Sequence, residues 1–327
     1  MNLYIVKKAF RKIFRPLYKI LTSKKILKAE NEELKYQLNY LKNHINPDNI
    51  KPATGILREY QLAELKFLDE VMKLLKQYNI TPFFDGGCLL GYCRHKGFVP
   101  WDDDIDLGLM RQDFDRLLKI MKNEMLFFEM NSLTDLKHPF SSIYDKIITE
   151  NPGKIAVVLS TTCIHIFKGT SLKDAVNVEI FPYDYVRESV TEEEYYNYKE
   201  KSKKKIQKLK NFGLKKIFDF YEQELNAENS VFSKEKTNKI TDGLGNFAFI
   251  EYKFRGFLKY DELFPLKETK FEGVNIYVPN NPERALQCIY GDYMRLPNDI
   301  GIAHSIEDIN AYLKDKGQDI IDYREKF

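Results

Sequence analysis

The sequence predicts a mixed α/β (α+β) domain that follows a long helical arm. Aliphatic residues recur at heptad spacing over 3–45, which is typical of a helix with one apolar seam. From residue 57 onward, strand-like runs and amphipathic helical segments succeed one another without strict alternation, which favours a mixed sheet. The 327 residues are 43% hydrophobic and 14% aromatic. This composition can bury a sizeable core and excludes collagen-like and wholly disordered proteins.

The distribution of charge and the cysteines argue against several classes of protein. The chain has 51 basic and 48 acidic residues, a net charge of +3, but residues 1–29 hold nine basic side chains and no acid. The remainder is net acidic, so a basic nucleic-acid-binding surface is poorly supported. No run of about 18 apolar residues predicts a transmembrane helix. The four cysteines lack paired metal spacing and favour a reducing compartment; they are Cys88, Cys93, Cys163 and Cys288.

The arm has the pattern of a coiled coil. With Leu3 at heptad position a, every position d is aliphatic: Val6, Ile13, Ile20, Leu27, Leu34 and Leu41. Asn31 falls at a, where a single polar residue fixes the register of two-stranded coils. Glu30 at g and Lys35 at the following e are placed to pair between chains. The pattern predicts a homodimer.

Pro16 interrupts this pattern and divides the arm in two. Before the proline the polar face is purely basic, which suits anionic lipid headgroups, so we expect residues 1–22 to contact a membrane surface. Residues 23–46 are predicted to form the coiled coil. The proline and glycine residues in 47–56 break regular secondary structure, so this segment is predicted to be a linker to a catalytic domain at 57–327. The alternative is one solvated helix that packs on its own catalytic domain.

Periodicity assigns the elements of residues 57–327. Helices are predicted at 57–78, 88–92, 112–123, 192–225 and 282–290. Strands are predicted at 81–84, 105–109, 126–130, 143–148, 155–159, 163–167 and 176–181, with a hairpin at 271–278.

The chemistry is predicted to centre on Asp104 and Asp106. Residues two apart on a strand share a face, about 7 Å apart along the backbone. Crowded carboxylates, with Asp102 and Asp103 beside them, repel one another unless a cation lies between them. Oxygen-only ligands select Mg²⁺ or Mn²⁺, the ions of phosphoryl and nucleotidyl transfer.

A glycine pair and a basic triplet accompany these carboxylates. Gly86 and Gly87 are suited to a tight turn whose backbone N–H groups approach a phosphate. Arg94, His95 and Lys96 supply possible donors to a diphosphate. We expect these five residues to form the nucleotide- and phosphate-binding side.

The segment GGCLLGYCRHKGFVPWDDDIDLGL, which begins at Gly86, resembles the signature of the LicD family, which includes the fukutin-related proteins. Asn177–Asp184 and Tyr290–Pro297 are similar to two further motifs of that family. The resemblance covers about residues 57–305. It implies a nucleotidyltransferase fold of the polymerase-beta-like superfamily, with helical additions.

The resemblance also implies an activity. A LicD-like enzyme would use Mg²⁺ or Mn²⁺ to pass a phosphorylated alcohol, such as phosphocholine, from a CDP-activated donor to a hydroxyl of a cell-surface glycan. Asp104 and Asp106 would hold the metal, and Glu179 would be the third carboxylate, as metal ligand or base. Because the family usually has Asp there, Asp184 is the alternative. Asp184, Asp292 and Tyr293 are the candidates for the acceptor side.

Two rival functions stay open. One is a nucleotidyltransferase that releases pyrophosphate, and the other is a catalytically silent scaffold of glycan assembly. The donated group and the accepting sugar are not specified by the sequence. Because such acceptors are often built on lipid carriers, we expect the protein in the cytoplasm, peripheral on the inner face of the membrane.

Overall fold

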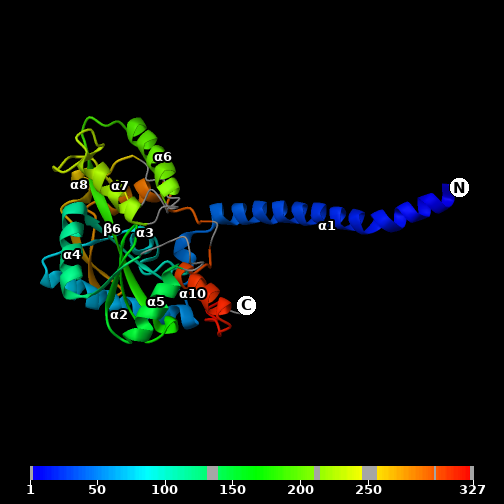
Figure 1. Cartoon of the computed structure of the whole chain (residues 1–327), viewed down its shortest axis with the longest axis horizontal. Coiled ribbons are helices and arrows are strands. Elements are labelled where there is room, and N and C mark those ends of the chain that lie inside the picture. Colours follow the sequence, from blue (N-terminus) through cyan, green and yellow to red (C-terminus); the bar gives the residue numbers. More distant parts are fainter. Residues whose placement is uncertain (1–2, 131–138, 210–213, 245–255, 298–299, 325–327) are drawn as a thin grey trace. The chain divides into compact units, whose positions relative to one another are not determined.

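The computed structural model describes residues 3–130, 139–209, 214–244, 256–297 and 300–324 (Figure 1). The chain divides into two compact units. One comprises Met1–Asn49 with Arg295–Asn298, and the other comprises Ile50–Met294 with Asp299–Phe327. Each unit is described by itself.

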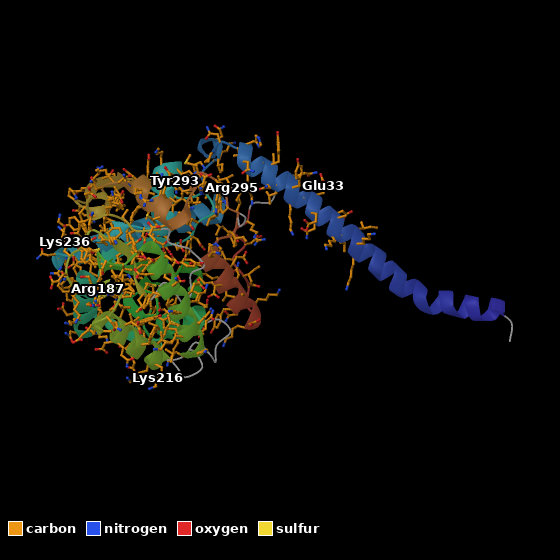
Figure 2. All side chains as sticks on the ribbon, turned by 90° about the horizontal axis from the view of Figure 1, so that it is seen from above. Glu33, Arg187, Lys216, Lys236, Tyr293 and Arg295 are labelled. Carbon is orange, nitrogen blue, oxygen red and sulfur yellow. The ribbon has the colours of Figure 1, made fainter. Side chains whose placement is uncertain are left out.

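The arm is a single helix, α1 (Leu3–His44), followed by a 3₁₀ turn at Pro47–Asn49. The helix continues through Pro16, so the predicted interruption does not break it. Side chains described from residue 24 onward stand out from α1, as Glu33 does in Figure 2. Within this unit, Arg295 Nη2 donates to Asn39 Oδ1 at 2.8 Å. Among the described helices, none is long and apolar enough to cross a membrane.

The second unit is built on an eight-stranded mixed sheet. The main path has the order β1-β2-β6-β5-β4-β3, and β7 and β8 both pair with β6. The pairs β2–β6 and β3–β4 are parallel, whereas β1–β2, β4–β5 and β5–β6 are antiparallel. The strands are β1 (Phe83–Phe84), β2 (Ile105–Met110), β3 (Leu126–Glu129), β4 (Ala156–Leu159), β5 (Ile164–Lys168), β6 (Val176–Val186), β7 (Phe232–Ser233) and β8 (Ile240–Asp242). The predicted mixed α/β fold is confirmed.

Helices pack on this sheet. Helix α2 contacts β6, α3 contacts β2, and α4 contacts β2, β3 and β6. Helices α5 and α10 contact each other, as do α6 and α7. The helices are α2 (Gly55–Gln77), α3 (Gly86–Leu90), α4 (Arg111–Glu124), α5 (Pro139–Glu150), α6 (Glu192–Leu209), α7 (Leu214–Asn226), α8 (Tyr260–Leu263), α9 (Pro282–Tyr290) and α10 (His304–Asp315), and a π-helical turn at Gly91–His95 follows α3.

The apolar pattern explains the central strands. Ile105, Leu107, Val178 and Ile180 are fully buried, and these residues alternate with polar ones on β2 and β6. Since side chains alternate across a strand, the polar residues between them share the opposite face. A two-stranded sheet of β9 (Lys267–Phe271) and β10 (Val274–Val278) forms the predicted hairpin.

Two assignments need correction. The predicted strand at 143–148 lies within helix α5, because Ile143 and Ile147, like Tyr144 and Ile148, are four residues apart and fit a helical face. The predicted helix at 192–225 is two helices, α6 and α7; residues 210–213 between them lie outside the described part.

Candidate active site

Strands β2 and β6 bring the predicted carboxylates together. In their parallel register Asp106 is the partner of Glu179, between the buried pairs Ile105–Val178 and Leu107–Ile180. Asp104 immediately precedes β2 and, two residues from Asp106, shares its face. The structure therefore places Asp104, Asp106 and Glu179 on one face at the sheet's centre.

The glycine pair packs directly against these carboxylates. Gly86 has φ of +47°, and a Cβ added there would collide with the Asp106 carboxylate. A Cβ on Gly87 would collide with the Asp102 carboxylate. The Gly87 N–H donates to Asp106 Oδ2 at 3.2 Å. The turn therefore needs glycine because two carboxylates approach its backbone.

Asp103, unlike the neighbouring aspartates, accepts hydrogen bonds from the backbone of α10. It is fully buried and accepts hydrogen bonds from the backbone N–H groups of Ser305, at 3.2 Å, and Ile306, at 2.6 Å. These bonds fix the first turn of α10 to the loop that carries Asp104. Gln61 holds the same loop by donating to the carbonyl of Asp102 at 2.9 Å.

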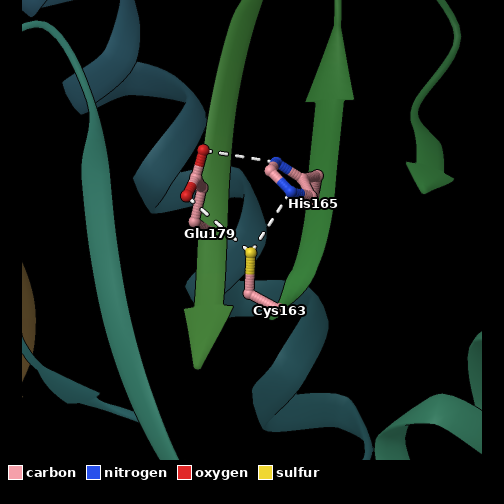
Figure 3. Close-up of side chains that lie close together, drawn as sticks. All are labelled: Cys163, His165 and Glu179. Carbon is pink, nitrogen blue, oxygen red and sulfur yellow. Dashed lines mark hydrogen bonds and ion pairs between the residues drawn. The ribbon is translucent and has the colours of Figure 1, made fainter. Parts of the chain in front are cut away.

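Glu179 contacts His165 of the neighbouring strand β5 and Cys163, which immediately precedes that strand (Figure 3). Its Oε1 lies 3.2 Å from His165 Nδ1, and Cys163 Sγ donates to its Oε2 at 3.8 Å. Cys163 Sγ also lies 3.2 Å from His165 Nε2. The three ligand atoms lie within 4.8 Å of one another. The Glu179 carboxylate is thus directed at this pair.

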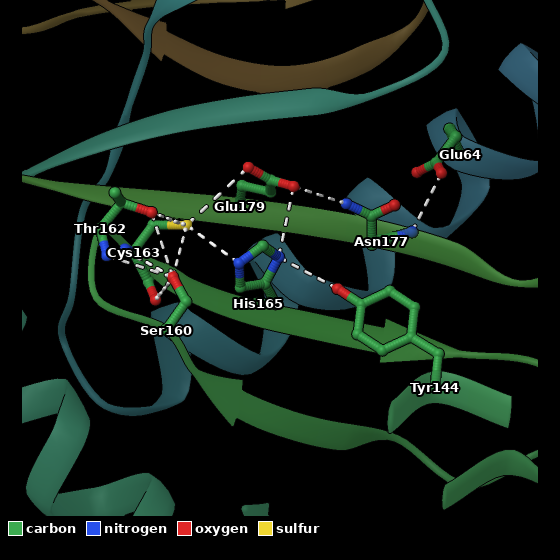
Figure 4. A network of polar contacts seen from close by, with 8 residues as sticks. All are labelled: Glu64, Tyr144, Ser160, Thr162, Cys163, His165, Asn177 and Glu179. Atoms are coloured by element: carbon green, nitrogen blue, oxygen red, sulfur yellow. Dashed lines mark hydrogen bonds and ion pairs between the residues drawn. The ribbon is translucent and has the colours of Figure 1, made fainter. Parts of the chain in front are cut away.

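A longer chain of polar contacts surrounds Glu179 (Figure 4). Asn177 Nδ2 donates to Glu179 Oε1 at 3.3 Å, and the Asn177 backbone N–H donates to Glu64 Oε1 at 2.9 Å. The Tyr144 hydroxyl lies 3.0 Å from His165 Nδ1. Glu64 is fully buried, and its Oε2 has no hydrogen-bond partner among the described residues.

Burial and mutual repulsion shift the pKa values of the acidic groups. Burial, followed by the charge of Glu179, raises the pKa of Asp104 to about 6. Burial and the charges of Asp104 and Glu179 raise the pKa of Asp106 well above its ordinary value. Burial opposes ionisation of Glu179 too, but the charge and hydrogen bond of His165, together with hydrogen bonds from Cys163 and Asn177, outweigh burial and lower the pKa of Glu179. Buried carboxylates that repel one another are the environment that a cation relieves.

The donor set fits a hard divalent cation. Asp102, Asp103 and Asp104 offer ligand oxygens that lie within 4.8 Å of one another, and Asp106 adds another carboxylate on the same face as Asp104. Mg²⁺ and Mn²⁺ prefer such oxygen ligands. Asp103 already anchors α10, which leaves Asp102, Asp104 and Asp106 as the candidate ligands.

The basic triplet is not a single cluster. Arg94 is 2% exposed, and its Nη1 donates to the Tyr293 carbonyl at 2.7 Å while its Nε donates to His95 Nε2 at 2.9 Å. Lys96 is exposed and lines a cavity of about 830 Å³ with Lys267, Lys270 and Tyr293. The cavity is lined by none of Asp104, Asp106 and Glu179.

The remaining predicted residues lie elsewhere. Asp184 is buried and accepts from Arg111 Nε at 2.8 Å and Nη2 at 2.9 Å. Five residues from Glu179 on the same strand, it points to the opposite face. Asp292 is exposed and Tyr293 is partly buried. The structure therefore brings Glu179, and not Asp184, to Asp104 and Asp106.

Sequence reasoning missed the partners of Glu179. Cys163 immediately precedes β5 and His165 lies on it, so alternation places these two residues on one face. The spacing does not predict which strand lies alongside. A cavity of about 250 Å³ also opens beside Asp104 and Glu179. His304 and Asp308 of α10 line this cavity and were not predicted to be near it.

Comparisons with known proteins bear on this site. Residues 79–218 match the family described as LicD/FKTN/FKRP, nucleotidyltransferase domain. Lipopolysaccharide cholinephosphotransferase LicD of Haemophilus influenzae is 27% identical over 271 residues, which cover 74% of this chain and 92% of that protein. Ribitol-5-phosphate transferase FKTN of Mus musculus is 25% identical over 120 residues, covering 37% and 23%. An uncharacterized protein of Rickettsia typhi is 40% identical over 63 residues, covering 17% and 20%. The predicted resemblance is confirmed.

Proposed function

Because this chain carries a LicD-family nucleotidyltransferase domain, we propose that it is a phosphotransferase that acts on a glycan. It transfers a phosphorylated alcohol, phosphocholine or a related group, from a CDP-activated donor to a hydroxyl of a cell-surface glycan. The observation that carries the proposal is the pairing of Asp106 with Glu179 beside Asp104. The names of the Haemophilus and mouse relatives support phosphoryl-alcohol transfer and, for the former, lipopolysaccharide.

Asp104 and Asp106 hold Mg²⁺ or Mn²⁺ in this proposal, with Glu179 beside them. The ion would neutralise the phosphate oxygens of the donor and so favour attack on phosphorus. Gly86 and Gly87 let Asp106 and Asp102 sit close to the turn that begins α3. The buried Cys88 also contacts β2, since its Sγ accepts a hydrogen bond from the Asp106 N–H at 3.3 Å.

Glu179 acts on the acceptor. The acceptor oxygen forms a bond to the phosphorus that carries the alcohol, and the bridging bond of the diphosphate breaks to release CMP. The proton of the acceptor hydroxyl passes to the Glu179 carboxylate. His165 lowers the pKa of Glu179, which keeps this carboxylate ionised at neutral pH and able to accept the hydroxyl's hydrogen bond.

The donor side uses the glycine turn and the basic triplet. His95 and Lys96 are the proposed donors to the diphosphate. Arg94 positions His95, because it is buried and donates hydrogen bonds to His95 Nε2 and to the Tyr293 carbonyl. Tyr293 and Asp292, which follow α9, are the proposed contacts of the acceptor glycan.

The arm gives the protein a partner and a location in this proposal. The apolar seam positions Leu27, Leu34, Leu38, Leu41 and Ile45 are 43–64% exposed. The contact of Asn39 with Arg295 lies at heptad position b, away from the a/d seam. A second copy of α1 would bury the seam, and the basic residues before Pro16 would contact the inner face of the cell membrane from the cytoplasm.

Product analysis separates the proposal from its rivals. Purified protein in Mg²⁺ or Mn²⁺ should release CMP from a CDP-alcohol in the presence of acceptor glycan. Release of pyrophosphate from CTP or ATP instead would establish the nucleotidyltransferase. Unchanged glycan modification in cells that carry only the Asp106→Asn variant would establish the non-catalytic scaffold.

A further inference from the structure

A thiol, an imidazole and a carboxylate meet beside the proposed reaction centre (Figure 3). In the antiparallel register of β5 and β6, His165 lies directly opposite Glu179. Cys163, two residues before His165, shares its face. Cys163 is 1% exposed and His165 is 3% exposed. The proposed function uses the Glu179 carboxylate as a base, but it gives the buried thiol no part in the reaction.

The ligand atoms of these three residues have the spacing of a tetrahedral metal site. Cys163 Sγ lies 3.2 Å from His165 Nε2 and 3.8 Å from Glu179 Oε2. Zinc bonds of about 2.3 Å to sulfur and about 2.0–2.2 Å to nitrogen and oxygen place tetrahedral ligand atoms about 3.5 Å apart. The two distances lie on either side of that value. An ion between these atoms therefore requires only small movements of the side chains.

The imidazole of His165 is held in place through its other ring nitrogen. His165 Nδ1 lies 3.0 Å from the Tyr144 hydroxyl and 3.2 Å from Glu179 Oε1. These contacts fix the ring so that its Nε2 faces Cys163 Sγ. A histidine that binds a metal through one ring nitrogen usually bonds a carboxylate, a carbonyl or water through the other. The imidazole is therefore already oriented as a ligand.

The surroundings of the sulfur are suited to a thiolate, which is the form in which cysteine binds metals. Thr162 Oγ1 donates to Cys163 Sγ at 3.5 Å, and Ser160 Oγ lies 3.6 Å from the same atom. Hydrogen bonds from hydroxyl groups strengthen when the acceptor is charged. These two side chains would therefore stabilise the sulfur more in its charged form than as a thiol.

Two cavities give an ion access to the three residues. His165 and Glu179 line the cavity of about 250 Å³, whose wall also contains His304 and acidic residues. Cys163 lines a larger cavity of about 1120 Å³. A zinc site with three protein ligands takes water or a substrate atom as its fourth ligand. Both cavities have room for that water.

We propose that Cys163, His165 and Glu179 form a second metal site, which takes Zn²⁺ rather than Mg²⁺. Thiolate and imidazole are ligands of zinc, whereas Mg²⁺ prefers the oxygen ligands that Asp104 and Asp106 supply. Zinc replaces the thiol proton, which passes to solvent. Zinc binding goes beyond the proposed function, but its consequence rests on it. A Glu179 carboxylate that binds zinc no longer accepts the proton of the acceptor hydroxyl, so Zn²⁺ stops the transfer.

Co²⁺ is the probe for the site, because it occupies zinc sites and its bond to a thiolate gives an intense absorption band in the near ultraviolet. The full-length protein, freed of metal with EDTA, should develop this band on titration with Co²⁺, and Zn²⁺ should abolish it. Cys163→Ser and His165→Gln should lack the band. Two variants are the controls that should keep it: Cys93→Ser, which removes a partly buried cysteine elsewhere, and Asp106→Asn, which removes a proposed Mg²⁺ ligand.

Melting temperature supplies a second readout that does not depend on turnover. Zn²⁺ should raise the melting temperature of the wild type and of Asp106→Asn, but not that of His165→Gln. Absence of the cobalt band in the wild type, or a band that persists in Cys163→Ser, would overturn the site and leave the proposed function standing.

Inhibition tests the consequence for Glu179. In excess Mg²⁺, Zn²⁺ should inhibit CMP release by the wild type, with each protein compared with its own rate without zinc. Half-inhibition of Cys163→Ser should need at least about tenfold more Zn²⁺. Equal sensitivity of the two proteins would overturn the link between zinc and Glu179. If no CDP-alcohol releases CMP, the proposed function fails, and the cobalt spectrum still decides whether the metal site exists.

Discussion

Asp106 of β2 and Glu179 of β6 are direct partners across a parallel pair of strands. They lie 73 residues apart in the sequence, and the buried residues on either side of each fix which face they share. With Asp104 they form a group of buried negative charges. The proposed chemistry depends on this relationship.

Neutralising Asp106 should abolish activity without unfolding the protein. Asp106→Asn removes a proposed metal ligand, so we expect CMP release to fall about 100-fold or more. Because burial and the charges of Asp104 and Glu179 raise the pKa of Asp106, loss of its charge should also raise the melting temperature in chelator by a few degrees. Asp319→Asn, an exposed change, should alter neither quantity. A loss of activity accompanied by a fall in melting temperature would indicate a structural role instead.

Stability should depend on pH in a direction set by the buried carboxyls. Burial and neighbouring charge raise the pKa of Asp103 to about 7 and that of Asp104 to about 6. The folded protein therefore binds more protons than the unfolded chain between about pH 4 and 7, so the free energy of unfolding should fall as pH rises through this range. Urea unfolding in EDTA at pH 5 and 7.5 measures the effect. Added Mg²⁺ should restore stability at pH 7.5, and equal stability at both pH values in EDTA would contradict the account.

The glycine turn should tolerate no side chain. Gly86→Ala places a Cβ against the Asp106 carboxylate and strains a backbone with φ of +47°. We expect a loss of about 1–3 kcal/mol in the free energy of unfolding, together with loss of activity. Gly317→Ala is the matched control, since Gly317 has φ of +68° and open space around it. It should cost only about 1 kcal/mol of backbone strain and keep activity. Equal effects of the two changes would exclude the close approach as the cause.

The arm should determine the oligomeric state. Leu34→Glu and Leu41→Glu put charges into the exposed apolar seam of α1, and we expect a dimer to become a monomer in light scattering. Glu33→Ala, an exposed position at heptad c outside the seam, is the control. CMP release from soluble substrates should be unchanged in all three variants. A wild-type protein that is monomeric at micromolar concentration would refute the coiled coil.

Membrane contact is a separate property of the arm. Deletion of residues 1–46 removes the nine basic side chains of 1–29 together with the seam. The truncated protein should no longer sediment with vesicles that contain anionic lipid, whereas the full chain should sediment with them and not with neutral vesicles. Unchanged sedimentation after the deletion would rule out the arm as the membrane contact.

The local sequence pattern predicted the helices and strands better than it predicted which of them lie side by side. The alternation around Ile105 and Leu107 placed Asp104 and Asp106 on one face of a strand, as the structure has them. The register of β2 with β6 depends on contacts between distant segments, which periodicity cannot give. The role of Glu179 came from the family resemblance, and its contacts with Cys163 and His165 required the neighbouring strand to be known.

Burial explains the errors at the site. The sequence indicates that Arg94 is a free cation beside Lys96. In the structure its side chain is buried and donates to the Tyr293 carbonyl, about two hundred residues away in sequence. The sequence offers Asp184 as an alternative third carboxylate, but in the structure Arg111 forms an ion pair with it on the other face of β6. In the segment 143–148, β-branched residues suggested a strand, while the spacing of Ile143 and Ile147 fits the helix that forms.

Binding of Mn²⁺ tests the central claim most directly, because it requires neither donor nor acceptor. Electron paramagnetic resonance should detect saturable Mn²⁺ binding by the full-length protein, displaced by Mg²⁺ and lost in Asp104→Asn and Asp106→Asn, while Asp319→Asn binds as the wild type does. Equal binding by the wild type and both site variants would contradict a cation held by these two carboxylates.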